Sequence, residues 1–168
     1  MTTVALDPTV ELPLTVQLYR NVKNVPELRQ KVIAGQIKCC FINPKYILDP
    51  FQLIVAANKA LTCENRITKT VFTEILYNLS ISKNITRSLQ QFGITDDCRD
   101  LLVVMVGGES DGAAAQIDGE EADLGVLEEI RDLGAIRKAY KIKELEEKNT
   151  TLLDSVVSRI ATKDFIVH

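Results

Sequence analysis

The chain has 168 residues, of which 46% are hydrophobic and 26% are charged, and its formal net charge is −3. This composition is too apolar for a disordered chain, and it lacks the positive excess that is typical of nucleic-acid-binding proteins. We therefore expect one compact domain spanning residues 1–168, and the overall charge does not indicate a partner.

No stretch of the sequence approaches the roughly 18 unbroken apolar residues of a membrane helix, and the first residues lack the features of a signal peptide. The cysteines Cys39, Cys40, Cys63 and Cys98 form no CxxC pair. We interpret them as reduced, mostly buried thiols, which fits a soluble protein of the cytoplasm and nucleus.

The first part of the chain predicts two strands joined by a helix. Leu14 to Tyr19 alternates apolar and polar residues, the period of a half-buried strand. Asn24 and Glu27 have the spacing of a capping box, which predicts a helix that ends at Gly35. The apolar run from Ile37 to Ile42 predicts a second, buried strand. A helix between two strands favours their parallel pairing.

The segment from Asn43 to Leu61 predicts a helix that is buried on most sides. Asp49 is a suitable N-cap, Pro50 suits the first turn, and Gln52 is spaced to reach back to the backbone amide of the cap. The following residues are apolar almost all round, the pattern of a helix covered by its neighbours. A chain that uses this helix for packing is expected to work by presenting a surface.

The middle of the chain predicts two more strands around a helix. Val71 to Leu79 is rich in β-branched and aromatic residues and predicts a strand. Asn84 predicts the start of a helix that Gly93 ends in the left-handed conformation. Asp100 to Val106 is the most continuous strand pattern in the chain. Together these elements predict an α/β fold, with a small mixed sheet of about four strands and packed helices.

Residues 107–124 predict an acidic insertion. Glu109 to Asp132 contains nine acidic residues and one basic residue, Arg131, so the near-neutral total conceals an acidic segment on a mildly basic body. We interpret the insertion as a solvated loop. Regulation and the repulsion of wrong ligands are the alternatives.

The last part of the chain predicts a long carboxy-terminal helix. Residues 135–142 fit either an edge strand or the end of a helix, but Thr151 and Asp154 form a clear capping signature. The helix that follows carries an apolar stripe that is wide for a surface helix. The stripe consists of Leu152, Leu153, Val156, Val157, Ile160 and Ala161.

The sequence offers no recognisable catalytic centre. The single histidine is His168, a poor position for a general base. The Gly107-Gly108 pair is followed by Glu109 instead of the lysine of a phosphate loop. We therefore expect no enzymatic activity, no metal and no cofactor. An enzyme that uses a carboxylate or a cysteine in an unfamiliar arrangement is the least favoured alternative.

Several basic residues are expected around the exit of the buried helix and two nearby loops. They form either a phosphate-contacting patch or a solvated charged rim, and no interleaved aromatic residues mark a platform for base stacking. The candidate tRNA-binding residues are Lys59, Arg66, Lys69, Lys83 and Arg87.

Three segments occur in the order and spacing of one known family. They are VKNVPELRQKVIAGQI with its continuation FINPKYILDPFQLIVAANKA, then TEILYNLSISKNITRSLQQFGI, and then TLLDSVVSRIATKDFI. Together they resemble the TPRKB-like family, the kinase-binding subunits of the EKC/KEOPS complex. The resemblance covers about Val22 to Ile166 and weakens over Gly107 to Leu133.

The resemblance implies a non-enzymatic regulatory subunit that binds the amino-terminal lobe of the small atypical kinase/ATPase of that complex. The complex installs threonylcarbamoyl on the adenosine beside the anticodon of certain tRNAs (t6A), and the transfer chemistry belongs to another subunit. In archaeal relatives this subunit also contacts the 3′ end of tRNA, which gives the basic residues a use. A tRNA-binding protein that acts independently of the kinase is the alternative.

We expect the carboxy-terminal helix to carry more apolar surface than the core can bury. Its excess would dock on the kinase in an interface of about 1,600 Å², dominated by a few anchors. Alternatively, the whole stripe faces the core. The candidate kinase-contact residues are Leu152, Leu153, Val156, Val157 and Ile160.

Overall fold

The computed structural model describes residues 2–4, 13–107 and 112–165. The acidic residues Glu109 and Asp111 and the single histidine, His168, therefore lie outside the described residues, as does Gly108. Within the described residues, no helix combines the length and the apolarity that crossing a membrane requires.

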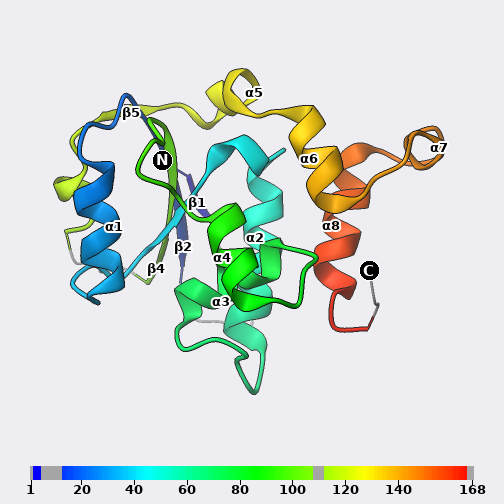
Figure 1. Cartoon of the computed structure of the whole chain (residues 1–168), viewed down its shortest axis with the longest axis horizontal. Coiled ribbons are helices and arrows are strands. Elements are labelled where there is room, and N and C mark those ends of the chain that lie inside the picture. The colour runs from blue at the N-terminus through cyan, green and yellow to red at the C-terminus, as the bar shows by residue number, and fades with distance from the viewer. Residues whose placement is uncertain (1, 5–12, 108–111, 166–168) are drawn as a thin grey trace.

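An antiparallel sheet forms the centre of the described fold (Figure 1). The strands follow the order β1-β2-β4-β3, and β5 also pairs with β2. Their bounds are β1 Thr2–Val4, β2 Leu14–Arg20, β3 Cys40–Ile42, β4 Leu101–Val106 and β5 Glu120–Ala122. The predicted α/β class is confirmed. The sheet is not mixed, because every described ladder is antiparallel.

The predicted parallel pairing of the first two long strands is wrong, because β4 lies between them. Leu18 of β2 pairs with Leu102, and Ile42 of β3 pairs with the same residue from the other side. Since both strands are antiparallel to β4, they run in the same direction, as a crossover helix requires, but they do not pair with each other.

Helices cover both faces of the sheet (Figure 1). Side chains alternate along β4, so that Leu102 and Val104 face one core while Leu101, Val103 and Met105 face the other. The first core lies under α2, α3, α6 and α8, and the second lies under α1. Burial on both faces explains why β4 is apolar throughout.

The helices that surround the sheet vary in length. The longer ones are α1 Val25–Ile33, α2 Pro50–Thr62, α3 Val71–Leu79, α4 Ile85–Phe92, α6 Leu133–Tyr140 and α8 Leu152–Thr162. Short helices are α5 Leu127–Ile130 and α7 Glu144–Glu147. The segment that fitted either a strand or a helix is therefore largely helical. Helix α6 ends at Tyr140, and the left-handed backbone of Lys141 closes it.

The strand predicted at Val71–Leu79 is wrong, because these residues form α3. Thr70 and Thr73 make a reciprocal capping box: the backbone amide of each donates to the side chain of the other. The buried carboxylate of Glu74 also accepts hydrogen bonds from the backbone amides of Ile67 and Thr68. These local bonds, together with packing on α2, outweigh the strand propensity of the segment.

Some of the predicted helix caps are confirmed and two predicted cap contacts are wrong. The Asp49 side chain accepts from the amide of Phe51 and the Asn84 side chain from that of Arg87, so both N-caps are confirmed. Gln52 does not reach back to Asp49. Its side chain instead accepts from the amide of Leu48.

The second failed cap is Asn24, whose side chain makes no cap hydrogen bond to α1. It instead holds the acidic insertion: its amide nitrogen donates to Gln116 O at 2.8 Å, and its oxygen accepts from the amide of Asp118 at 3.0 Å. Ala113 and Ile117 are buried in the core under α1. The described part of the insertion is therefore attached to the core at these two residues, whereas its acidic side chains, Asp118, Glu120, Glu121 and Asp123, are exposed as the sequence predicted.

Gly93 ends α4, but not in the predicted left-handed conformation, because its backbone is extended (φ −74°, ψ 168°). Glycine is required there for a different reason: a Cβ would lie 2.5 Å from the backbone oxygen of Leu89. We expect Gly93→Ala to lower the free energy of unfolding by roughly 1–3 kcal/mol, measured by denaturant titration.

The matched control for this substitution is Gly134→Ala in α6. There the nearest atom to a new Cβ is the Asp132 carboxylate oxygen at 3.4 Å. This variant should be unchanged or up to about 1 kcal/mol more stable, because alanine favours the helix. Equal effects of the two substitutions would contradict the close approach at Gly93.

Candidate partner-binding helix and basic groove

The carboxy-terminal helix α8 begins where the sequence predicts. The Thr151 hydroxyl accepts from the amide of Asp154 at 3.1 Å, which caps the helix. Val156 and Ile160 are 0% and 1% exposed and belong to the core between α8 and α2. These two candidate kinase-contact residues are therefore not available to a partner while α8 is packed on α2.

The other three candidates lie nearer the surface of α8. Leu152 and Leu153 are half-buried against the core, and Val157 is half-buried. Leu153, Val157 and the exposed Ala161 are spaced four residues apart, so they share one face of the helix. We call these three residues the outer stripe.

The outer stripe leads toward an exposed aromatic side chain that the sequence analysis missed. Phe165 follows four residues after Ala161, in the turn after α8, and is 86% exposed. The repeat of the four-residue spacing beyond the end of the helix was the available signal. We call the outer stripe and Phe165 together the apolar strip, because exposed apolar side chains that gather on a surface mark contact sites.

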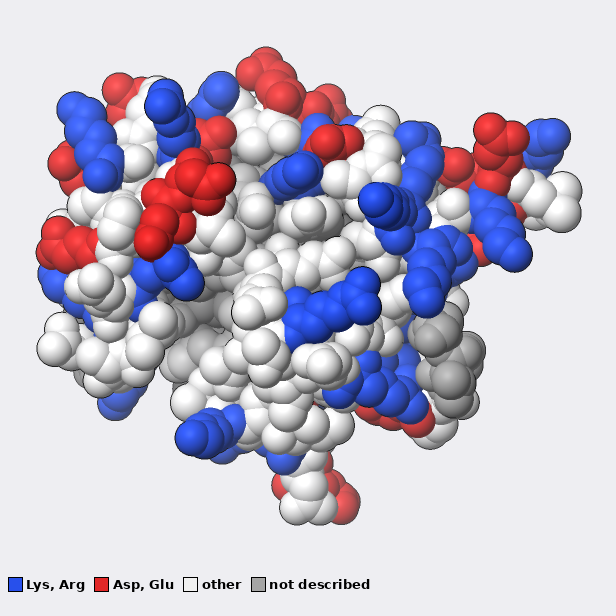
Figure 2. All heavy atoms as spheres, viewed as in Figure 1, with Lys and Arg blue, Asp and Glu red and all other residues white. Residues whose placement is uncertain are grey.

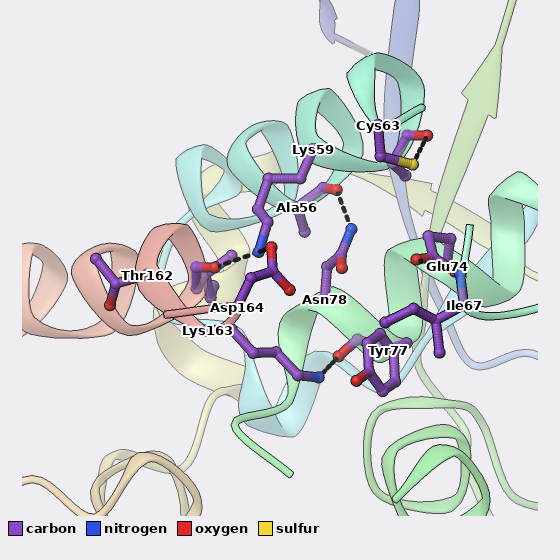
Figure 3. Close-up of polar contacts among 12 residues, drawn as sticks. Ala56, Lys59, Cys63, Ile67, Glu74, Tyr77, Asn78, Thr162, Lys163 and Asp164 are labelled. Carbon is purple, nitrogen blue, oxygen red and sulfur yellow. Dashed lines mark hydrogen bonds and ion pairs between the residues drawn. The ribbon is translucent and has the colours of Figure 1, made fainter. Parts of the chain in front are cut away.

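The end of α8 is held by polar contacts to two other helices (Figure 3). Lys59 of α2 donates to the backbone oxygen of Ile160 at 2.8 Å and pairs with Asp164 at 3.3 Å. Lys163 donates to the backbone oxygen of Tyr77 in α3. Three helices are thus joined at this point, which fixes the direction in which the outer stripe faces.

The last turn of α8 is also held by an ion pair with α7. The guanidinium of Arg159 donates to both oxygens of Glu146, at 2.6 and 2.7 Å. These hydrogen bonds lower the pKa of Glu146 to about 2. Glu146 is therefore ionised at neutral pH and can accept both hydrogen bonds of Arg159.

An open groove of about 1040 Å³ lies between α4, α6 and the segment before α2. It contains a single acidic residue, Asp132, whose carboxylate already caps α6 by accepting from the amide of Ala135. Figure 2 shows basic side chains gathered on the face that carries α4 and α6. The basic residues that line the groove are Lys45, Lys83, Arg87, Lys138 and Lys141, all of them exposed.

The structure does not bring the five predicted tRNA-binding residues together. Lys83 and Arg87 lie in the basic groove, whereas Arg66 and Lys69 line a separate hollow of about 690 Å³. Lys59 is engaged by α8, and 20% of its side chain is exposed. The sequence analysis missed Lys45, Lys138 and Lys141, which come from distant parts of the chain.

A third hollow, of about 370 Å³, is mainly apolar and lies between α1, α3, α4 and β3. Ile33, at its rim, is 78% exposed, and Phe72, Leu76 and Leu89 are half-buried along it. The buried Cys39 also lines it, and burial raises the pKa of that thiol to about 12. Cys39 is therefore a neutral wall of the hollow and not a nucleophile.

Among the described residues, no three histidine, cysteine, aspartate or glutamate side chains are grouped so as to hold a metal ion. The described surface instead offers an apolar strip on an anchored helix, a basic groove and an apolar hollow. These are features of a protein that binds partners.

Comparison with known proteins identifies the family. The model of the kinase binding protein CGI-121 family matches residues 19–164. The EKC/KEOPS complex subunit TPRKB of Danio rerio is 38% identical over 162 residues, which cover 92% of this chain and 93% of that protein. The EKC/KEOPS complex subunit cgi121 of Aspergillus fumigatus is 32% identical over 170 residues, covering 90% of each chain. The chain therefore belongs to the CGI-121 family of kinase-binding proteins.

Proposed function

We propose that this chain is a non-catalytic, regulatory subunit of an EKC/KEOPS complex, where it binds the small atypical kinase/ATPase and supports t6A modification of tRNA. The observation that carries the proposal is the partly exposed apolar face of α8 together with the exposed Phe165 in the turn after it, in a chain whose relatives are named as subunits of that complex. The proposed place of action is the cytoplasm and the nucleus, where its free cysteines stay reduced.

The anchoring of α8 supports its use as the kinase-binding element. Contacts through Lys59, Lys163 and the Arg159–Glu146 pair hold the carboxy-terminal end of the helix, and the Thr151 cap holds its start. A helix that is already ordered loses little conformational entropy when a partner binds, so more of the contact energy appears as affinity. Leu153, Val157 and Phe165 are the proposed anchors, and Leu152 lies at their edge.

The test is binding of the purified chain to the purified small kinase/ATPase of the complex. We expect capture at one-to-one stoichiometry, measured by size-exclusion chromatography with light scattering. Binding of the kinase should also protect the backbone amides of α8 from hydrogen exchange. Failure of the two proteins to associate would overturn the proposed function.

We further propose that the chain contacts tRNA through the basic groove. The supporting observation is that five exposed cations line one groove whose single carboxylate is already used as a helix cap. Such a groove attracts phosphates, and its contacts are weakened by salt. If the isolated chain binds tRNA tightly but does not bind the kinase, the alternative of an independent tRNA-binding protein is favoured.

Replacing Arg87 and Lys138 by glutamine is expected to weaken tRNA binding and to reduce the slope of log K against log[salt]. Each lost phosphate contact should reduce that slope by roughly 0.7 to 0.9. A titration of labelled tRNA at several salt concentrations measures both effects. The control is Lys148→Gln, because Lys148 is exposed at the end of α7 and does not line the groove. If the double variant and Lys148→Gln give the same slope of log K against log[salt], the groove does not contact tRNA.

A further inference from the structure

Lys163 is an unusual lysine, because it is only 1% exposed and no ion pair involves it within the described residues. Its amine donates to the backbone oxygen of Tyr77 and lies 3.3 Å from the centre of the Tyr77 ring (Figure 3). The neighbouring carboxylate, Asp164, pairs with Lys59 instead. A buried ammonium without a paired carboxylate loses the favourable free energy of hydration, and its contacts in the protein replace only part of that free energy.

The charges around Lys163 come from every helix that meets there. Burial is the main cause that lowers its pKa, and the positive charges of Lys59 on α2 and Lys83 before α4 act in the same direction. Asp164 beside it and Glu74 on α3 oppose this effect. The result is a pKa of about 7 for Lys163, against an ordinary value of 10.5.

The remaining titratable group at this point is the phenol of Tyr77, whose pKa is raised, mainly by burial. It stays neutral around pH 7 and does not offset the charge of the lysine. The docked position of Lys163 therefore favours a neutral amine, whereas a solvated position favours an ammonium.

We propose that the turn after α8, residues 163–165, is a charge-sensitive latch: with a neutral Lys163 amine it docks on Tyr77 and holds the end of α8, and protonation of that amine favours its release. Three observations at one place carry the proposal. They are a buried amine, the absence of an ion pair to it among the described residues, and the attachment of α8 to α2 and α3 through the same turn. The latch is a property of the chain alone and stands whether or not α8 binds a kinase.

The direction of the pH effect follows from the two environments of the amine. Below about pH 7 the lysine is protonated whether docked or released, so the ratio of docked to released turn does not change with pH. Above pH 7 only the docked lysine loses its proton, and docking becomes more favourable. The ratio should rise about fivefold between pH 7 and pH 8, and about tenfold per unit above that, up to the ordinary pKa of lysine.

The experiment is an NMR titration of the full chain carrying ¹³C-labelled lysine, from pH 6 to pH 10. We expect the Cε signal of Lys163 to titrate near neutral pH while those of the exposed lysines do not. Hydrogen exchange at the end of α8 should slow as the pH rises, after correction for the intrinsic exchange rate. The Cε signal is assigned as the one that disappears in Lys163→Met.

Lys163→Met keeps the length of the side chain and removes its charge, so docking should no longer depend on pH. Lys148→Met, which replaces an exposed lysine at the end of α7, is the matched control and should behave as the wild type. An ordinary pKa for Lys163 would overturn the proposal, as would the same pH dependence of exchange in wild type and Lys163→Met. If Lys163→Met does not fold, the wild-type titration decides, with Lys163 assigned from backbone connectivity.

Discussion

Val157→Asp is expected to weaken capture of the small kinase/ATPase by about thirtyfold or more, while the chain stays folded. Val157 is half-buried in the middle of the outer stripe, between Leu153 and Ala161. A carboxylate there would have to be desolvated against an apolar partner surface, and the loss of a central anchor typically costs 2 kcal/mol or more. Isothermal titration calorimetry of the variant with the purified kinase measures the loss.

The control for this variant is Ser158→Asp, one residue further along α8 and exposed. It adds the same charge to the same helix outside the outer stripe, so the two variants differ mainly in whether the strip is interrupted. Circular dichroism shows whether each remains folded. If Val157→Asp is folded and binds as tightly as the wild type, α8 is not the contact, and the apolar hollow beside Ile33 becomes the next surface to test.

Tyr140→Phe is expected to lower the free energy of unfolding by roughly 2–4 kcal/mol. The hydroxyl of Tyr140 is buried, donates to the backbone oxygen of Leu79 and accepts from the side chain of Gln52 at 2.7 Å. Burial also raises the pKa of this phenol far above its usual value, so the hydroxyl remains a donor at every accessible pH. Phenylalanine would leave a buried carbonyl and one N–H of Gln52 without a partner.

The control for Tyr140→Phe is Tyr46→Phe. Tyr46 belongs to the same aromatic cluster, in which the ring of Phe92 lies between those of the two tyrosines, but it is half-buried. Its replacement should change the stability by well under 1 kcal/mol. Equal losses in chemical denaturation would mean that the packing of the rings matters and the buried hydrogen bonds do not.

The sequence predicted the elements whose signals are local. Asp49, Asn84 and Thr151 each cap the helix that follows, and short polar side chains next to an apolar run identify such starts well. The α/β class and strand β4 could be predicted for a similar reason, because a long apolar run reports burial on both faces.

Features that depend on distant residues were not predictable in this way. The segment 71–79 resembles a strand, and only the bonds from Glu74 to the preceding loop and the packing on α2 make it helical. Strand β3 pairs with β4 because residues 101–106 enter the sheet between two earlier strands. Neither the helix at residues 71–79 nor the pairing of β3 with β4 can be predicted from the local sequence pattern.

The candidate site could be predicted only in part. The apolar face of α8 was recognised, but its periodicity could not tell that Val156 and Ile160 face α2 while Val157 lies on the outer side. The basic groove needed the positions of Lys45 and Lys138, which are far apart in the sequence and meet only through the packing of α6. Which residues of a helix are buried, and which distant residues share a groove, both depend on the tertiary structure.

The position of β4 at the centre of the sheet also sets an order of events during synthesis. Its two neighbours, β2 and β3, are complete once Ile42 has left the ribosome, but the strand that joins them ends at Val106. Until then β2 and β3 each leave unpaired the edge that β4 later occupies, and the strand that contributes side chains to both cores is missing. The amino-terminal half of the chain therefore cannot finish folding while it emerges, and the sheet closes late, through contacts between distant residues.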